Sequence, residues 1–240
     1  MNEQTLERLY ALRLPAMADK LKEMEKDPTF AALPFTDTLA MLVDAEYDSR
    51  SSKRITTLLK KARLKYSTAC LEDLRYDPSR NLKKEVIREL RSCRFLTEAN
   101  NILVSGATGT GKSYLACALG NLACRNGYRV SYYRLSVFLD AMAAERALGT
   151  YAKALEKLRK VKLLILDDLS ADVLKAEERK ILFDVIEERY LQGSVIVTSA
   201  VPVTQWNEVI GEPSAAEGIC DRLFHHCHRI DLKGESMRKK

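Results

Sequence analysis

Two hydrophobic patterns divide the chain into an N-terminal part and a C-terminal part. Over roughly the first 65 residues, apolar side chains recur three and four positions apart, which is the period of amphipathic helices. From Asn101 onward, short aliphatic runs alternate with amphipathic stretches, a pattern typical of a parallel sheet with helices on its faces. The sequence therefore predicts a small all-helical domain followed by an α/β domain.

Proline and capping residues mark the helix boundaries expected in the N-terminal part. Pro15 suits the first turn of a helix better than the middle of one, so the chain is expected to begin with a short helix pair. Thr36 or Asp37 can cap a third helix, which is expected to continue toward the basic segment described below. Residues 66–78 are expected to form a connector, and residues 82–94 a helix that leads into the α/β domain.

Five strands are expected in the α/β part, at residues 101–106, 129–135, 162–167, 194–199 and 228–232. The main helices between them are expected at residues 111–125, 136–147, 176–191 and 215–225. This pattern predicts three regions, at residues 1–65 (helical domain), 66–98 (connector and helix) and 99–240 (α/β domain).

A glycine-rich segment after the first expected strand has the pattern of a phosphate-binding P-loop. Residues 106–113 fit G-x-x-x-x-G-K-[ST] at every fixed position. Glycines let consecutive backbone N–H groups close around phosphate oxygens, and the start of the following helix adds partial positive charge. Lys112 is expected to reach the β- and γ-phosphates, and Ser113 to hold Mg²⁺. The expected nucleotide-binding residues are Gly106, Ala107, Thr108, Gly109, Thr110, Gly111, Lys112 and Ser113.

A second motif follows the third expected strand. The aliphatic run at residues 161–166 leads to Asp167 and Asp168 at the carboxyl edge of the sheet, where ligands bind in parallel sheets. Asp167 is expected to hold Mg²⁺ together with Ser113, through water or directly, and Asp168 to polarise the attacking water. An aspartate pair by itself is a weak signal because it often only caps a helix; its position downstream of a P-loop makes it a strong one.

Two further places are candidates for catalytic residues. Strand 194–199 ends in Thr198 and Ser199, and either hydroxyl can contact the γ-phosphate or the water if this strand lies beside the P-loop strand. Ordinary turn chemistry is the alternative for both. Arg222, in an Asp-Arg-Leu motif, is either a surface cation or an arginine finger that reaches the γ-phosphate of a neighbouring subunit, an effect worth about 10³ to 10⁵ in rate.

The charge distribution points to a nucleic-acid partner. The chain of 240 residues has a formal net charge of +6 at pH 7, and no acidic residue occurs from Ser49 to Leu71. A basic block of this kind is typical of proteins that contact a phosphate backbone, while a solvated helix face is the alternative. The expected DNA contacts are Arg50, Lys53, Arg54, Lys60, Lys61, Arg63 and Lys65.

Composition argues against several other classes of protein. The hydrophobic fraction of 46% and the charged fraction of 30% are those of an ordinary soluble domain, and no apolar run approaches the ~18 residues of a membrane span. The N-terminus lacks the basic start and apolar block of a secretory signal. The six cysteines include no C-x-x-C pair, and residues 220–228, although rich in Cys and His, match no usual zinc spacing. We therefore expect a cytoplasmic protein with reduced cysteines and no membrane partner.

In this order, the motifs resemble those of the AAA+ ATPases, and more narrowly those of the IstB-like ATP-binding proteins of bacterial insertion sequences. The DnaC-type helicase loaders share the ATPase half, but the N-terminal helical pattern is similar to that of the transposition group. The resemblance covers nearly the whole chain and is carried by residues 12–18, 60–64, 101–116, 163–169, 197–199, 206, 221–223 and 234–238.

This resemblance implies a P-loop AAA+ fold without a helical lid domain, and an ATPase that uses ATP and Mg²⁺. It implies a regulator of DNA transposition that forms homo-oligomers on duplex DNA through ATP sites at subunit junctions and recruits or stimulates a transposase. Hydrolysis would control assembly and release. Asp168 stands where AAA+ proteins most often carry glutamate, which implies slow turnover, and Ala200 stands near where many relatives have asparagine or glutamine. Arg238 is a candidate substitute for a lid-domain sensor.

Three other functions remain open on the sequence. A DnaC-like helicase loader would share the ATP chemistry but prefer single-stranded DNA, for which aromatic stacking platforms are expected; the basic segment offers only Tyr66. A small-molecule kinase would also use a P-loop, although no substrate lid is evident. A nucleotide-gated DNA scaffold that scarcely hydrolyses ATP is favoured by the short side chain of Asp168.

Overall fold

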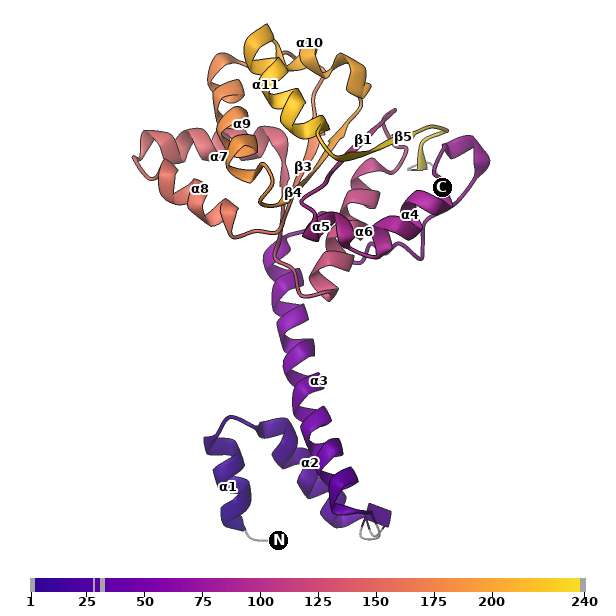
Figure 1. Ribbon diagram of the computed structural model, residues 1–240, viewed down its shortest axis with the longest axis vertical. Helices are drawn as coiled ribbons and strands as arrows, with labels where there is room; N and C mark the ends of the chain where they lie inside the picture. The colour runs from indigo at the N-terminus through magenta and orange to yellow at the C-terminus, as the bar shows by residue number, and fades with distance from the viewer. Residues whose placement is uncertain (1–2, 28, 31–32, 238–240) are drawn as a thin grey trace. The chain divides into compact units, whose positions relative to one another are not determined.

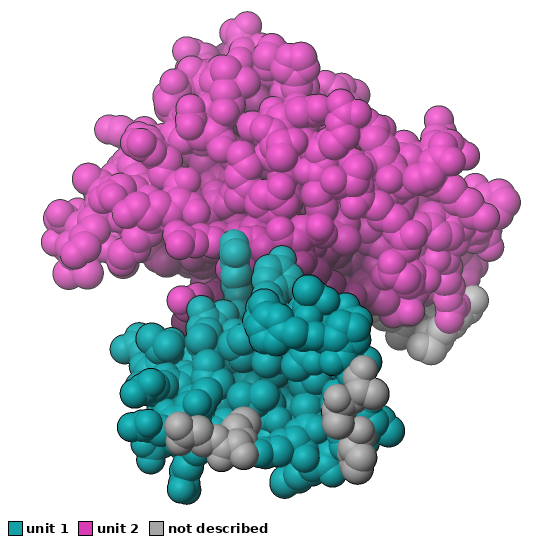
Figure 2. All heavy atoms as spheres, turned by 60° about the horizontal axis from the view of Figure 1, so that its bottom comes forward, with its two compact units in different colours: residues 1–57 teal, residues 58–240 magenta. Residues whose placement is uncertain are grey.

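The computed structural model describes residues 3–27, 29–30 and 33–237. Its contacts divide the chain into two compact units, residues 1–57 and 58–240 (Figure 2). The division falls within one long helix, and residues 58–98 pack with the second unit. The three-region division drawn from the sequence stays a prediction.

The first unit is helical, as the apolar spacing predicts. It contains α1 (Glu3–Ala11), α2 (Pro15–Lys26) and most of α3 (Phe35–Ala62). Pro15 is the first residue of α2, where its missing N–H costs no helical hydrogen bond. Helix α3 begins at Phe35, so Thr36 and Asp37 lie in its first turn and do not cap it. It continues into the basic segment, as expected.

A buried carboxylate links α2 to α3. Glu46 on α3 is 8% exposed and accepts hydrogen bonds from the backbone N–H groups of Ala16 and Met17 at 2.9 and 3.1 Å. These are two of the N–H groups that lack intrahelical partners at the start of α2, where a negative charge is also favoured by the helix dipole. Arg50 pairs with the same carboxylate at 2.7 Å, and together these contacts lower the pKa of Glu46.

The second unit contains one five-stranded parallel sheet, as predicted, with the strand order β2-β3-β4-β1-β5. The strands are β1 (Asn101–Gly106), β2 (Val130–Arg134), β3 (Leu163–Leu169), β4 (Ser194–Ser199) and β5 (Cys227–Leu232). Ile102 of β1 pairs with Ile196 of β4, which in turn pairs with Ile165 of β3. Because all strands run the same way, the carboxyl ends of β1, β3 and β4 meet at one edge of the sheet.

Helices cover both faces of this sheet (Figure 1). Successive strand residues point to opposite faces, so Ile102 and Val104 enter one core and Leu103 the other. The first core contains α4 (Lys84–Arg91), α5 (Arg94–Thr97) and α6 (Lys112–Arg125). The second contains α7 (Leu135–Ala147), α8 (Tyr151–Arg159), α9 (Ala176–Arg189), α10 (Trp206–Ile210) and α11 (Pro213–Phe224). Short 3-10 turns occur at η2 (Pro78–Arg80) and η3 (Val203–Gln205).

The structure corrects the predicted helices in two respects. The helix expected at residues 82–94 is shorter: α4 ends at Arg91, and a second short helix, α5, begins at Arg94 after Cys93, which adopts a left-handed conformation with φ 56°. Helices α8 and α10 were missing from the prediction. Gly149, at φ 72°, separates α8 from α7, and α10 is only five residues long.

Buried cysteines line the inner side of α6. Cys117 and Cys124 lie seven positions apart on one face of this helix, and both are fully buried. Burial raises the pKa of each thiol to about 11, which keeps both protonated and unreactive near neutral pH. Within the described residues, no helix is both long and apolar enough to cross a lipid bilayer.

Candidate functional site

The glycine-rich segment forms the turn between β1 and α6. Gly106, Gly109 and Gly111 have φ values of 141°, 89° and 95°, which glycine adopts without the steric cost other residues incur. Lys112 is the first residue of α6, and its Nζ donates to the carbonyl oxygens of Gly106 and Ala107 at 2.6 and 2.9 Å. The turn therefore places a helix N-terminus and an ammonium group together, as phosphate binding requires.

A cavity of about 490 Å³ opens beside this loop. The P-loop residues Thr108, Gly109, Gly111, Lys112 and Ser113 form one part of its wall. The ends of β3 and β4 contribute Asp167, Asp168 and Thr198. The structure thus brings the two sequence motifs to one cavity. The rest of the lining comes mainly from the segment before β1, which the sequence analysis did not assign to the site; it includes Lys65, Tyr66, Asp73, Leu74, Arg75 and Arg80.

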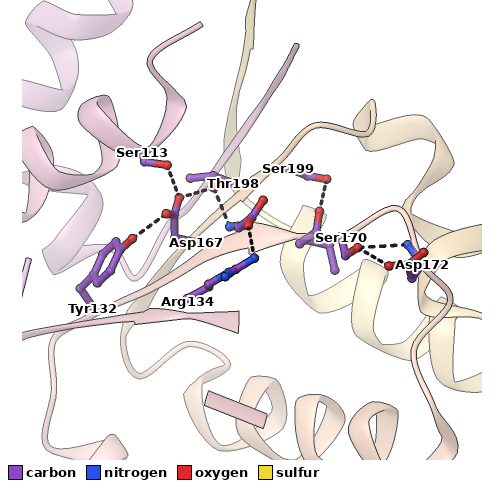
Figure 3. Close-up of polar contacts among 10 residues, drawn as sticks. Ser113, Tyr132, Arg134, Asp167, Ser170, Asp172, Thr198 and Ser199 are labelled. Carbon is purple, nitrogen blue, oxygen red and sulfur yellow. Dashed lines mark hydrogen bonds and ion pairs between the residues drawn. The ribbon is translucent and has the colours of Figure 1, made fainter. Parts of the chain in front are cut away.

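Asp167 is buried and accepts hydrogen bonds from three hydroxyl groups (Figure 3). Ser113 Oγ and Thr198 Oγ1 donate to Asp167 Oδ1 at 2.8 and 2.6 Å. Tyr132 OH, from β2, donates to Oδ2 at 2.5 Å. Burial, together with the Asp167 carboxylate, raises the pKa of Tyr132, so this phenol remains a proton donor. The aspartate at the centre of the site is therefore held on both of its oxygens.

Asp168 turns in a different direction from Asp167. Its φ is 72°, in the left-handed region, and the β3–β4 register shifts between Leu166 and Leu169. Its carboxylate is 54% exposed and pairs with Arg134 Nη2 at 3.2 Å (Figure 3). Its backbone N–H donates to Thr198 Oγ1 at 3.0 Å. The two adjacent aspartates thus have different environments, one buried among hydroxyls and one facing the cavity.

The two hydroxyl residues at the end of β4 also differ. Thr198 lines the cavity, accepts the Asp168 N–H and gives its single hydroxyl proton to Asp167. Ser199 is fully buried, donates to the carbonyl oxygen of Leu169 at 2.7 Å and accepts the Val201 N–H at 3.0 Å. The structure brings Thr198 into the site, whereas Ser199 stabilises the turn after β4 and does not line the cavity. This is the turn chemistry that the sequence left as an alternative.

Comparison with known proteins gives the family. Residues 7–240 match the family described as IstB-like ATP binding protein. The chain belongs to this family. An insertion sequence ATP-binding protein of Sinorhizobium fredii (strain NBRC 101917 / NGR234) is 36% identical over 235 residues, which are 98% of this chain and 96% of that protein. An insertion sequence ATP-binding protein of Pseudomonas fluorescens is 39% identical over 202 residues, or 84% and 87% of the two chains.

The fold of this IstB-like chain is also found among solved structures. The crystal structure of the DnaC helicase loader matches with a TM-score of 0.59 at 19% sequence identity, covering 70% of this chain and 98% of the loader. A likeness at this level of identity shows a shared fold. The α/β unit therefore has the P-loop AAA+ fold, as the sequence motifs imply.

Arg222 of the IstB-like chain lies on α11, outside the cavity lining. Its guanidinium pairs with the Glu187 carboxylate, donates to the carbonyl oxygen of Gly218 at 2.8 Å and lies 5.0 Å from the centre of the Phe183 ring. An arginine finger acts on a neighbouring subunit, so this position neither requires nor excludes that role. The arginine-finger assignment stays a prediction.

The seven basic residues predicted to contact DNA are spread over both units. Arg50, Lys53 and Arg54 belong to the first unit, and Lys60, Lys61, Arg63 and Lys65 to the second. Arg50 is held by Glu46 and by the carbonyl oxygen of Arg13. Lys65 lines the nucleotide cavity, with its Nζ 5.6 Å from the centre of the Tyr66 ring. Lys60, Lys61 and Arg63 are exposed.

The segment after β5 packs against the P-loop of the IstB-like chain. The backbone N–H of Met237 donates to the carbonyl oxygen of Gly109 at 2.9 Å. Arg80, in η2, donates to the carbonyl oxygen of Thr110 at 2.5 Å and to Met237 Sδ at 3.3 Å. No sequence motif marks Arg80, because only the fold brings residues 80 and 237 to the loop. Arg238, the candidate sensor, lies outside the described residues.

Substitution of Gly109 tests this packing. A Cβ atom at Gly109 would lie 2.2 Å from Ser236 Oγ, and φ 89° is itself unfavourable for alanine by about 1 kcal/mol. We expect Gly109→Ala to displace the C-terminal segment, lower the melting temperature and weaken binding of a fluorescent ATP analogue. Gly149→Ala is the control, because Gly149 has φ 72° but no neighbouring atom within 4 Å of a Cβ. Equal effects of the two variants on nucleotide affinity would contradict a role for this packing in holding the P-loop.

Proposed function

We propose that this chain is an ATP-hydrolysing regulator of DNA transposition that assembles on duplex DNA and recruits or stimulates a transposase. The observation that carries the proposal is the cavity shared by the P-loop, the buried Asp167 and the exposed Asp168. The family, and relatives that are insertion sequence ATP-binding proteins, supply the biological setting.

The residues present fit ATP with Mg²⁺. The P-loop N–H groups and Lys112 suit the phosphates. Ser113 directs its hydroxyl proton to Asp167, which leaves its oxygen lone pairs for a cation. Mg²⁺ accepts oxygen ligands and keeps several of its waters, so a hydroxyl can bind it directly and a carboxylate either directly or through a water. When bound, Mg²⁺ would neutralise charge that develops on the phosphate oxygens. Ser113 and Asp167 are the residues that would hold it.

Asp168 is the residue proposed to act on the attacking water. Hydrolysis joins a water oxygen to the γ-phosphorus, breaks the bond to the β-phosphate oxygen and releases a proton, which a carboxylate can accept. The side chain of Asp168 is exposed at the cavity, but it is paired with Arg134. Arg134 therefore competes with the attacking water for this carboxylate. This competition and the short aspartate side chain both favour slow turnover until assembly.

An isosteric change at Asp168 tests the hydrolytic role. We expect Asp168→Asn to lower the rate of phosphate release from ATP by about 10²-fold, since loss of a general base typically costs that much, with ATP affinity nearly unchanged. Asp172→Asn is the control, because Asp172 is also exposed beyond the end of β3 but bonds to Ser170 and does not line the cavity. Equal turnover in wild type and Asp168→Asn would instead favour a nucleotide-gated scaffold.

Assembly through the nucleotide site is the second part of the proposal. We expect the wild type to sediment as large complexes on duplex DNA with a non-hydrolysable ATP analogue, and as smaller species with ADP. Lys112→Ala should abolish the large complexes because its P-loop no longer holds the β- and γ-phosphates. Normal assembly by this variant would contradict the proposal. Preference for single-stranded DNA would favour a helicase loader, the alternative supported by the DnaC-like fold.

DNA contact by the basic segment is tested by its salt dependence. Lys60, Lys61 and Arg63 are exposed, so we expect their combined replacement by alanine to weaken binding to every duplex and to reduce the slope of log affinity against log salt by about 0.9 per lost contact. The control replaces Lys153, Lys157 and Arg159, three exposed cations of α8, by alanine. An unchanged slope in the first variant would remove this segment from the DNA footprint.

A further inference from the structure

Tyr132 contacts the centre of the site from a strand that carries no sequence motif. It lies on β2, next to β3 in the sheet, and Tyr132 itself pairs with Ile165, two residues before Asp167. Its side chain is half-buried, and its hydroxyl reaches Asp167 Oδ2 at 2.5 Å (Figure 3). The following residue, Tyr133, points to the other face of the sheet and packs on Phe138, with ring centres 5.1 Å apart. Tyr133 thus packs in the core, whereas Tyr132 donates a hydrogen bond to the Asp167 carboxylate.

The hydrogen bonds to Asp167 leave little acceptor capacity on this carboxylate. Each carboxylate oxygen has two lone-pair sites. Oδ1 receives Ser113 and Thr198, so both of its sites are taken. In the described part of the chain, Tyr132 is the donor to Oδ2, which leaves one site on that oxygen. The residue is 1% exposed, so its orientation is fixed by these three donors and not by bulk water.

The number of open acceptor sites determines whether Asp167 binds a cation directly or through a water. A carboxylate with one remaining acceptor site, and with its charge shared among three hydroxyls, is suited to accept one hydrogen bond from a metal-bound water. It is poorly suited to replace that water. Mg²⁺ gives up its water ligands reluctantly, whereas Ca²⁺ readily takes carboxylate oxygens directly. The number of donors on Asp167 therefore bears on which cation the site prefers.

From this geometry we infer that Tyr132 is a positioning residue that keeps Asp167 a water-mediated partner of Mg²⁺ and so favours Mg²⁺ over Ca²⁺ at the nucleotide site. The inference rests on the proposed function, because it requires a nucleotide–metal complex beside Ser113. Tyr132 acts through Asp167 and does not itself line the cavity. Without its hydroxyl, Oδ2 has both lone-pair sites open, and direct coordination by the carboxylate becomes favourable.

The variant Tyr132→Phe tests the inference. The measurement is the concentration of Mg²⁺ and, separately, of Ca²⁺ that gives half-maximal binding of a fluorescent ATP analogue to the full chain. We expect the ratio of the Ca²⁺ value to the Mg²⁺ value to fall about fivefold or more, in line with the effect of changing groups that orient metal ligands. Tyr133→Phe is the matched control, and its ratio should equal that of the wild type.

A purely structural role for Tyr132 predicts a different result. Loss of a buried hydrogen bond would lower the melting temperature and weaken binding with both cations alike, so the ratio would not change. If the wild type shows metal-dependent binding and the ratio in Tyr132→Phe is unchanged, the inference about Tyr132 is overturned, but the proposed function is not. Failure of the wild type to bind the analogue with either cation overturns the proposed function and the inference together.

A measurement on the wild type covers the case in which Tyr132→Phe does not fold. Mn²⁺ replaces Mg²⁺ in the complex with a non-hydrolysable ATP analogue, and the protein carries ¹³C-labelled aspartate. Electron–nuclear double resonance then reports whether a carboxylate carbon lies in the inner coordination sphere. We expect no inner-sphere ¹³C coupling in the wild type; a strong coupling, absent in Asp167→Asn, would overturn the inference.

Discussion

A buried carboxylate must be paired, and Asp167 is the group on which the arrangement of the site depends. Four elements meet at this side chain: β3 carries it, α6 supplies Ser113, β4 supplies Thr198 and β2 supplies Tyr132. Each donor has one hydroxyl proton, and each gives it to the carboxylate. If any of these elements moved by one residue, a charge with almost no solvent contact would lose a partner, at a cost of about 1 to 3 kcal/mol or more. The electrostatics of one residue therefore fix the register of the nucleotide site.

The P-loop is constrained from outside as well as by its phosphate-binding role. Leu232 packs against Gly106, Ser236 against Gly109 and Arg80 against Gly111, so at each glycine a side chain would meet another part of the chain. The segment before β1 and the segment after β5 thus enclose the loop that would hold the nucleotide. A movement of the loop on nucleotide binding would reach both segments, because a Cβ atom at Gly106, Gly109 or Gly111 would lie within 3.2 Å of one of them.

The two aspartates of the second motif have different environments. Asp167 accepts three hydrogen bonds, whereas the left-handed turn at Asp168 directs its carboxylate to the cavity and to Arg134. Arg222 is held by Glu187 and Phe183 on another helix. Asp168 and Arg222 each hold an ion pair that would compete with a role in hydrolysis. The proposed dependence of turnover on assembly has this physical basis.

The sequence by itself determined the class of fold, the five strands to within two residues at each end, and the P-loop, because each depends on local pattern: aliphatic runs, helical spacing, and glycines before Lys112. It also placed Asp167, Asp168 and Thr198 together, since parallel strands end at a common edge. Only the tertiary structure decided that Thr198 faces the cavity, whereas Ser199 forms hydrogen bonds within a turn. It also decided that Lys65 and Arg80 line the cavity. Finally, it decided that Tyr132 contacts Asp167 and that Arg134 contacts Asp168. These roles depend on which strands are neighbours and on how distant segments pack, and no local spacing of residues encodes either.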